Sequence, residues 1–359
     1  MSQETGGPLR GCDRPLIKHY GTGVFDLDGV VYRGGHPVPH AAAVLADVAR
    51  HGVRRLFLTN NSSRTPGEVA AVLLGLGIAA DEEQVVTSAE TAARMASELL
   101  PPHARVLVVG GAAVETALRR RGLAPVRSLD AGPVAVVQGF APEVDWRQLA
   151  EASYAIARGV PWIASDVDLR ITREHGIAPG NGTLVNAIRV ATGRDPLVAG
   201  KPEDAIFAEA ARRSSGACLV VGDGLSTDVA GARRNGLDSA LVLTGVSTVD
   251  ALLEAPPSAR PTYLVADLRG LFSSWPAVHR QRDGFACGGW TARWEAGKLA
   301  VLDDDGVPAG NEAVSVDSVV NAVRALCHAV WAAQDAGRKA EAGRNARWLL
   351  EWPGQEGLR

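Results

Sequence analysis

This sequence of 359 residues lacks long apolar runs, a cysteine framework and a strong excess of either charge. No stretch approaches the roughly 18 uninterrupted apolar residues of a membrane-spanning helix. The net charge of -3 gives no electrostatic reason to expect nucleic acid or an anionic membrane as a partner. The four cysteines form no Cys-x-x-Cys pair and have no nearby histidine at metal-ligand spacing, so neither a disulfide framework nor a zinc site is expected. We expect a cytoplasmic protein.

The first 15 residues are polar and rich in glycine, and they lack the apolar core of a signal peptide. We expect them to form a disordered tail. The remaining length is too great for one typical hydrophobic core, which predicts two domains or one domain with insertions.

From residue 24 to about residue 245, short apolar runs alternate with alanine-rich segments of helical period, which predicts βα units and a mainly parallel sheet. The expected strands are Val24–Leu27, Val53–Thr59, Val106–Val109, Val134–Gln138, Trp162–Ala164, Cys218–Val221 and Ala240–Leu243. The expected helices are His40–His51, Pro66–Leu76, Ala89–Leu100, Ala113–Arg121, Trp146–Arg158, Thr183–Ala191, Pro202–Arg213 and Thr227–Asn235.

Residues 261–359 differ in composition, since most of the tryptophans fall there. Two strands are expected around a turn at Glu295–Gly297, followed by a helix over Val316–Gln334 that Ser315 opens. The last residues are charged and alanine-rich, which predicts partly helical structure. This segment is therefore expected to be a small α+β extension.

The first expected strand carries two aspartates, Asp26 and Asp28, at its end. Successive side chains of a strand point to opposite faces, so these two start out on the same side. A buried carboxylate is costly unless it is paired, hydrogen-bonded or bound to a metal. The pair therefore predicts a partner across a crevice at the end of the sheet.

Three further apolar runs end in polar residues that can supply this partner. Thr59 and Asn60 end one strand, Lys201 precedes a helix, and Asp223 ends another strand. Ligands bind beyond the carboxyl ends of the strands in open α/β sheets, so we expect these groups to meet at one edge. Each motif alone is common in turns and helix starts. Four of them in order favour a functional site.

Phosphoryl transfer is the chemistry that requires this set. Asp26 can attack phosphorus, while Asp28 protonates the leaving alkoxide and later deprotonates the attacking water. Clustered carboxylates repel a phosphate dianion, so a hard divalent cation is implied, with Mg²⁺ expected on Asp26, Asp223 and the main-chain carbonyl of Asp28. The phosphoryl oxygens are then held by Thr59, the Asn60 amide and Lys201.

The same motifs resemble those of the haloacid dehalogenase-like phosphatases over about residues 24–248. The matching stretches, in order, are "DLDGVVYRG", "FLTNNSSRTP", "GKPEDAIF" and "VGDGLSTDVAGARRNG". The resemblance implies a Rossmann-like, doubly wound parallel-sheet core of the α/β class and the roles given above. It also implies that Asp228 is a carboxylate near the lysine or near the water molecules of the metal.

Motif spacing indicates the subclass. About thirty residues separate the first two motifs and about 140 separate the second from the third, which is room for an inserted domain only in the second interval. The chain resembles class IIA, the group of NagD-like and nitrophenyl phosphatases, with an α/β cap of the C2 type. The expected division is a core over residues 16–85 and 199–260, a cap over 86–198 and the extension over 261–359.

The cap motif departs from its group. The usual Asn-x-Asp is replaced by Asp166 and Asp168, which changes the expected substrate contacts. Arg173 and His175 lie in an expected cap loop, where they either read the polar end of a substrate or are simply solvated. The extension resembles that of actinobacterial members, some of which are glycerol 3-phosphate phosphatases.

We therefore expect a Mg²⁺-dependent phosphatase that forms an aspartyl-phosphate and hydrolyses a small phosphorylated metabolite, with glycerol 3-phosphate as the leading candidate. Sugar phosphates and phosphoglycolate remain alternatives within the enzymes. A binding or regulatory protein on the same scaffold is the alternative of another class. The resemblance also implies a possible homodimer through the cap.

Overall fold

The computed structural model describes residues 7–173, 175–295, 298–307, 314–339 and 349. The chain forms two compact units, one of residues 1–33, 37–55 and 215–359 and the other of residues 34–36 and 56–214. These units do not coincide with the expected core, cap and extension. That finer division stays a prediction.

A parallel sheet forms the centre of the first unit, with the strand order β15-β14-β13-β1. The strands are β1 (Thr22–Asp26), β13 (Cys218–Gly222), β14 (Asp238–Val242) and β15 (Tyr263–Val265), and the helices of this unit include α1 (Ala41–Arg50), α8 (Ala230–Arg234) and α9 (Val249–Leu253). Phe25 is in register with Val221, so β1 and β13 end together. Their carboxyl ends therefore present Asp26 and Asp223 at the same edge.

The parallel sheet extends further along the chain than expected. β15 was not predicted, and it pairs in parallel with β14 although it lies beyond residue 261. The predicted start of the extension at residue 261 stays a prediction. Three apolar residues, Tyr263–Val265, are too short a run to be told from a loop by periodicity.

In the second unit, β4 (Arg54–Thr59) pairs in parallel with β5 (Val85–Thr87), and this unit takes in β4 from Leu56 onward. The helices α2 (Pro66–Gly75) and α7 (Asp204–Arg213) belong to the same unit. A capping box formed by Thr65 and Glu68 begins α2, directly after the loop that carries Thr59 and Asn60.

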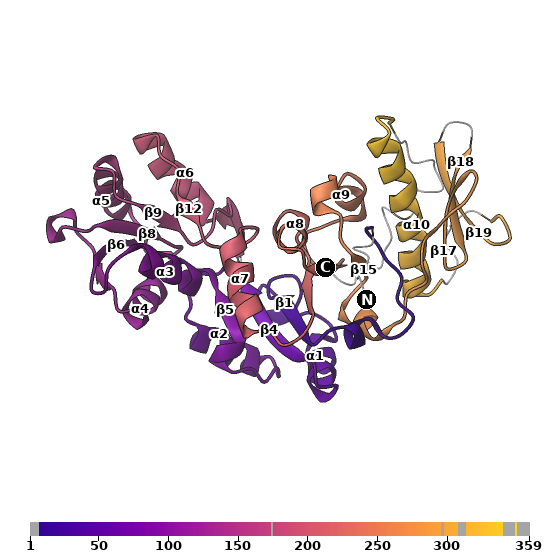
Figure 1. The fold of residues 1–359 in the computed structure, drawn as a ribbon, viewed down its shortest axis with the longest axis horizontal. Coiled ribbons are helices and arrows are strands. Elements are labelled where there is room, and N and C mark those ends of the chain that lie inside the picture. Colours follow the sequence, from indigo (N-terminus) through magenta and orange to yellow (C-terminus); the bar gives the residue numbers. More distant parts are fainter. Residues whose placement is uncertain (1–6, 174, 296–297, 308–313, 340–348, 350–359) are drawn as a thin grey trace. The chain divides into compact units, whose positions relative to one another are not determined.

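A five-stranded parallel sheet in the order β12-β9-β8-β6-β7 forms the rest of the second unit. Its strands are β6 (Arg105–Val109), β7 (Ala124–Val126), β8 (Ala135–Gln138), β9 (Trp162–Ala164) and β12 (Leu197–Val198). One face packs on α3 (Ser88–Leu99) and α4 (Ala112–Arg120), and the other on α5 (Trp146–Ala157) and α6 (Asn181–Thr192) (Figure 1). A hairpin of β10 (Arg170–Arg173) and β11 (Gly176–Pro179) precedes α6. The expected α/β insertion is thus present.

Among the described residues, the C-terminal part of the first unit contains a four-stranded antiparallel sheet and a long helix. The sheet comprises β16 (His279–Arg280), β17 (Gly284–Cys287), β18 (Trp290–Glu295) and β19 (Lys298–Asp303). α10 (Val316–Asp335) lies along it (Figure 1) and begins at Ser315, whose Oγ accepts a hydrogen bond from the Ser318 N–H. The predicted helix is confirmed. Two expectations, the turn at Glu295–Gly297 and the structure of the last twenty or so residues, fall largely outside the described residues.

The remaining short elements connect these layers. They are β2 (Tyr32–Arg33), β3 (His36–Pro37), the 3₁₀ helices at Leu16–His19, Glu82–Gln84, Leu129–Ala131, Pro257–Ala259 and Leu268–Phe272, and a π-helical turn at Leu225–Val229. None of the helices within the described residues is long and apolar enough to cross a membrane.

The expected disordered tail over residues 1–15 is wrong for residues 7–15, which are ordered against the first unit. The Leu9 N–H donates to the Pro261 carbonyl, Cys12 forms a β-bridge with Trp275, and Leu9 is buried. Arg324 on α10 is also buried and donates to the carbonyl oxygens of Leu9 at 3.2 Å and Arg10 at 2.9 Å. One buried guanidinium thus holds a segment that composition alone describes as loose.

Replacing Arg324 with methionine is expected to lower the free energy of unfolding of the first unit by about 3 kcal/mol, because the carbonyls of Leu9 and Arg10 lose their donor. Urea unfolding followed by tryptophan fluorescence measures this loss. The control is Arg50→Met on the exposed surface of α1, expected within about 0.5 kcal/mol of the parent. Equal midpoints for the two variants would contradict the role given to Arg324.

Candidate functional site

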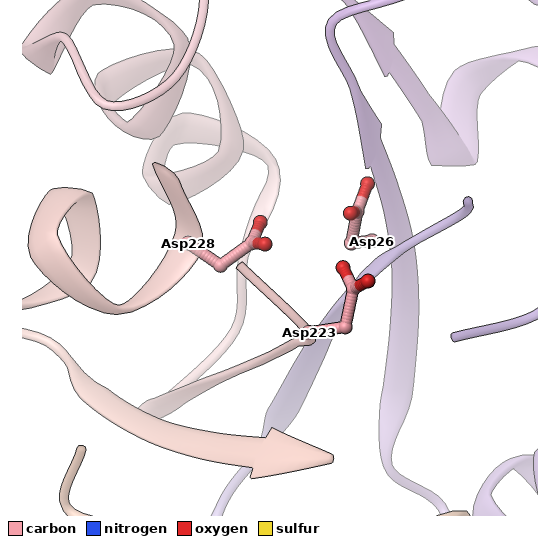
Figure 2. Close-up of side chains that lie close together, drawn as sticks. All are labelled: Asp26, Asp223 and Asp228. Atoms are coloured by element: carbon pink, nitrogen blue, oxygen red, sulfur yellow. The ribbon is translucent and has the colours of Figure 1, made fainter. Parts of the chain in front are cut away.

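Three carboxylates, those of Asp26, Asp223 and Asp228, converge in the first unit (Figure 2). One oxygen atom of each lies within 4.8 Å of the others. Asp26 ends β1, Asp223 follows β13, and Asp228 lies on the π-helical turn that precedes α8. Asp223 and Asp228 are buried and Asp26 is half-buried. The sheet edge therefore concentrates negative charge where solvent screens it poorly.

Each of the three carboxylates accepts one main-chain hydrogen bond from a nearby loop. The Leu27 N–H donates to Asp26 at 2.7 Å, the Val246 N–H to Asp223 at 2.7 Å, and the Gly224 N–H to Asp228 at 3.0 Å. Hydrogen bonds to the charged form favour that form of a carboxylate. These bonds orient the side chains.

Glycines make room for the cluster. A Cβ at Gly29 or Gly245 would overlap the Asp223 carboxylate, and Gly29 also has a φ of 83°. A Cβ at Gly222 would overlap the side chain of Asp228. Only glycine accepts both the close approach and the left-handed backbone at residue 29 without strain.

The donor set of this cluster fits a hard divalent cation. Carboxylate oxygens are the ligands that Mg²⁺ and Ca²⁺ prefer, and three of them at this separation can face one ion. The expected pairing of Asp26 with Asp223 is therefore realised in the structure. Asp228 was expected near the lysine or the metal's waters, and its carboxylate lies within the cluster itself. The signal in the sequence was that Asp228 lies at the start of an expected helix, shortly after Asp223.

Asp28 is placed differently from Asp26. Its side chain is exposed, its backbone forms a β-bridge with Tyr32, and it is not among the three clustered carboxylates. The expected metal set of Asp26, Asp28 and Asp223 therefore differs from the carboxylates that the fold gathers. The expectation for Asp28 concerned its main-chain carbonyl. Binding of Mg²⁺ by that carbonyl stays a prediction.

The expected phosphate ligands lie in the second unit, where Thr59 ends β4 and Lys201 follows β12. Both are buried, and Thr59 Oγ1 accepts a hydrogen bond from the Asn61 N–H at 3.0 Å. The Asn60 carboxamide oxygen accepts from the Lys201 N–H at 2.7 Å, and its nitrogen donates to the Lys201 carbonyl at 3.2 Å and to Asp168 at 3.0 Å. Any phosphate contact from Asn60 therefore has to come from its main-chain N–H.

Asp168 and Asp166 follow β9 in the cap loop. Asp166 is 4 % exposed and accepts hydrogen bonds from the Ser165 hydroxyl at 2.8 Å and the Asp168 N–H at 3.2 Å. Burial, together with the charge of Asp168, raises the pKa of Asp166 to about 7. Sequence reasoning missed both Ser165 and Asn181. The side chain of Asn181 donates to the Asp166 carbonyl at 2.8 Å. The signal for Asn181 was a polar residue at a helix start after Pro179 and Gly180.

The other two cap residues belong to the β10–β11 hairpin. Arg173 ends β10 in register with Gly176, and His175 lies in the turn with its side chain exposed. Their expected contact with a substrate stays a prediction.

Comparisons with known proteins agree with this arrangement. A family model described as haloacid dehalogenase-like hydrolase matches residues 23–124, and a second, described as HAD-hydrolase-like, matches residues 198–271. A D-glycerol 3-phosphate phosphatase of Mycobacterium tuberculosis is 43 % identical over 316 residues, which cover 87 % of this chain and 86 % of that protein. The chain belongs to the haloacid dehalogenase-like hydrolases.

Solved structures of this hydrolase family show the same fold. Crystal structures of a glycerol phosphate phosphatase from M. tuberculosis, in complexes with calcium and with magnesium, are 40 % identical to this chain with TM-scores of 0.82 and 0.81, and both cover 94 % of this chain and 98 % of theirs. NagD from Escherichia coli is 28 % identical with a TM-score of 0.63, over 69 % of this chain and 96 % of its own. The predictions of the fold class, of a NagD-like hydrolase and of a phosphatase are confirmed.

A second group of relatives matches less of this hydrolase. An acid sugar phosphatase of Staphylococcus saprophyticus is 34 % identical over 257 residues, covering 70 % of this chain and 96 % of that protein. Nearly the full length of that phosphatase therefore matches only part of this chain.

Divalent cations are expected to raise the melting temperature of the protein, because an ion relieves the repulsion among Asp26, Asp223 and Asp228. Thermal unfolding with increasing MgCl₂ measures the shift. Asp223→Asn should remove most of it, since one charged ligand is lost. The matched control is Asp250→Asn, which removes an exposed carboxylate of α9 and should keep the shift. A shift that survives Asp223→Asn would place the ion elsewhere.

The raised pKa of Asp166 predicts a pH dependence of stability. The folded protein keeps the Asp166 proton up to about pH 7, whereas the unfolded chain releases it near pH 4, so this group makes stability fall as pH rises through that interval. Asp166→Asn removes the group, so its melting temperature relative to the parent should be higher at pH 8 than at pH 5. For Asp195→Asn, an exposed cap residue, we expect the same difference at both pH values. A constant difference for Asp166→Asn would refute the shift.

Proposed function

We propose that this chain is a Mg²⁺-dependent phosphatase for glycerol 3-phosphate and that it forms an aspartyl-phosphate on Asp26. One observation carries the choice of substrate. The match to the M. tuberculosis D-glycerol 3-phosphate phosphatase spans 316 residues, more than the 260 that precede the expected extension, so it includes part of the extension. The acid sugar phosphatase of S. saprophyticus matches over 257 residues.

In the proposed first step, a carboxylate oxygen of Asp26 attacks phosphorus and the ester P–O bond breaks. The leaving alkoxide takes a proton from Asp28, which gives glycerol and the aspartyl-phosphate. In the second step Asp28 removes a proton from a water molecule, whose oxygen attacks phosphorus. The acyl-phosphate bond then breaks, which releases inorganic phosphate and restores both carboxyl groups. Splitting the hydrolysis in this way needs a nucleophile and a separate acid/base, which Asp26 and Asp28 supply.

The proposed Mg²⁺ ligands are the carboxylates of Asp26 and Asp223 and the carbonyl of Asp28. Asp228 either binds the ion directly or accepts hydrogen bonds from its water molecules. When bound, Mg²⁺ supplies positive charge that offsets the carboxylates and the phosphate. The clustering of Asp26, Asp223 and Asp228 and the magnesium complex of the M. tuberculosis protein support this assignment.

Thr59, the main-chain N–H of Asn60 and Lys201 are proposed to hold the phosphoryl oxygens. A buried hydroxyl and a buried ammonium stabilise developing charge strongly because little water screens them. Asp168, Arg173 and His175 are proposed to contact the rest of the substrate from the cap loop and the β10–β11 hairpin.

A sugar phosphate is the second candidate substrate, and the 34 % identical acid sugar phosphatase of S. saprophyticus favours it. Phosphoglycolate is a weaker alternative, because none of the relatives described above is named for it. A protein that only binds partners would keep the fold without turnover. These candidates differ in what they release from a panel of esters.

A cytoplasmic location and a homodimer through the cap are also proposed. All four cysteines are thiols, which fits a reducing compartment. Sedimentation of the purified protein tests the dimer.

The test of the proposed function measures phosphate release from glycerol 3-phosphate, a sugar phosphate and phosphoglycolate, with Mg²⁺ and with EDTA. We expect the highest kcat/KM for glycerol 3-phosphate and loss of activity with EDTA. Asp26→Asn should reduce turnover by at least about 10⁴-fold, since it removes the nucleophile.

A quench experiment tests the intermediate. With [³²P]glycerol 3-phosphate, acid should trap label on the protein that hydroxylamine removes, and Asp26→Asn should carry none. Asp250→Asn serves as the control and should resemble the parent in both assays. No release from any ester with Mg²⁺ would favour the binding protein, while turnover without trapped label would contradict the aspartyl-phosphate.

A further inference from the structure

We propose that Asp166 is a positioning residue of the phosphate site, which it supports through a chain of hydrogen bonds that runs by way of Asp168 and Asn60 to the backbone of Lys201. This inference rests on the proposed function, because it concerns the lysine that is proposed to hold the phosphoryl group. It adds Asp166 as the residue that positions the backbone of Lys201. It also adds that ionisation of Asp166 weakens this positioning.

The chain begins at the buried end. Asp166 Oδ1 accepts the Asp168 N–H at 3.2 Å, and Asp166 Oδ2 accepts the Ser165 hydroxyl at 2.8 Å. These bonds fix the main chain of the cap loop at Asp168. Asp168 Oδ2 in turn accepts a hydrogen bond from Asn60 Nδ2 at 3.0 Å.

Asn60 carries the chain to the lysine. Its carboxamide forms hydrogen bonds with the N–H of Lys201 at 2.7 Å and with the carbonyl of Lys201 at 3.2 Å. It therefore holds the peptide groups on both sides of the Lys201 Cα. A Cβ at Gly200 would overlap this carboxamide, so the glycine permits the close approach. Lys201 itself is buried, which leaves its side chain little freedom to correct a shift of its backbone.

The groups that face Asp166 make its charge state matter. Asp168 is the charged group on its own loop, Ser165 and Asn181 at the start of α6 are neutral, and Lys201 joins the chain at its far end. The end of β8 offers the Gln138 carbonyl, which is also neutral and accepts from the Ser165 N–H. Protonated Asp166 adds no charge beside Asp168, whereas ionised Asp166 places a buried negative charge next to that of the half-buried Asp168.

Ionisation of Asp166 is therefore expected to weaken the Asp168–Asn60 hydrogen bond. The hydrogen bonds between Asn60 and the backbone of Lys201 should weaken with it. Because burial raises the pKa of Asp166 to about 7, the loosening would occur near neutral pH. Asparagine at residue 166 has the same shape, keeps an oxygen acceptor and never ionises, so it should preserve the chain at all pH values.

The test compares kcat/KM for glycerol 3-phosphate from pH 5.5 to pH 9 in the parent and in three variants. The parent should lose activity as pH rises through about 7, and Asp166→Asn should remove that loss while retaining activity within about twofold at pH 6. Asp166→Ala should lose about tenfold or more at every pH, with the larger part in KM if phosphate binding depends on Lys201. Asp195→Asn, an exposed carboxylate of the same unit, is the matched control and should follow the parent.

A double-mutant cycle tests the connection itself. Asn60→Ala and Asp166→Ala should each cost about tenfold, and the double variant should cost little more than one of them, because both break the same chain. Additive losses would overturn the proposal, as would an alkaline loss of activity that persists in Asp166→Asn.

A readout without substrate separates this proposal from the proposed function. Hydrogen exchange at the Lys201 amide, which donates to Asn60, should be faster in Asp166→Ala than in Asp166→Asn. If the parent hydrolyses no ester but this difference holds, the proposed function fails and the positioning chain stands. If exchange at Lys201 is the same in both variants, the positioning chain fails whatever the activity.

Discussion

The mutual repulsion of Asp26, Asp223 and Asp228 is the constraint on which the first unit depends. Two unit charges 4 Å apart repel by about 4 kcal/mol at the effective dielectric typical of proteins, so the cluster costs stability unless something offsets it. The fold supplies one main-chain hydrogen bond to each carboxylate and glycines where a Cβ would intrude. These features orient the three carboxylates so that they can face one divalent cation, which is what a metal site requires.

Two carboxylates also lie close together in the second unit. Asp166 and Asp168 lie two residues apart, and burial together with the charge of Asp168 raises the pKa of Asp166 to about 7. Asp168 also accepts a hydrogen bond from the side chain of Asn60. The carboxylate groups of the two units thus differ in their hydrogen-bond donors and in their burial.

The extension and the N-terminal segment depend on each other through one buried cation. Arg324 on α10 contacts the carbonyls of Leu9 and Arg10 and lies over the ring of Trp275. Tryptophans that composition marks as unusual therefore belong to the core of the first unit, as Trp275, Trp290 and Trp331 all are buried. The extension is an integral part of this unit.

Much of the fold and the candidate site followed from sequence because local rules apply to them. Alternating apolar runs and helices predicted the parallel sheets, and the rule that ligands bind beyond strand ends correctly predicted that Asp26 and Asp223 share one edge. β15 and the ordered residues 7–15 could not be predicted, because three apolar residues or a polar stretch become structure only through partners far along the chain.

The tertiary structure alone decided three features. They are the raised pKa of Asp166, the hydrogen bonds between Asn60 and Lys201, and the place of Asp228 in the carboxylate cluster. All three depend on burial and on distances between segments separated by many residues, which a linear pattern does not contain.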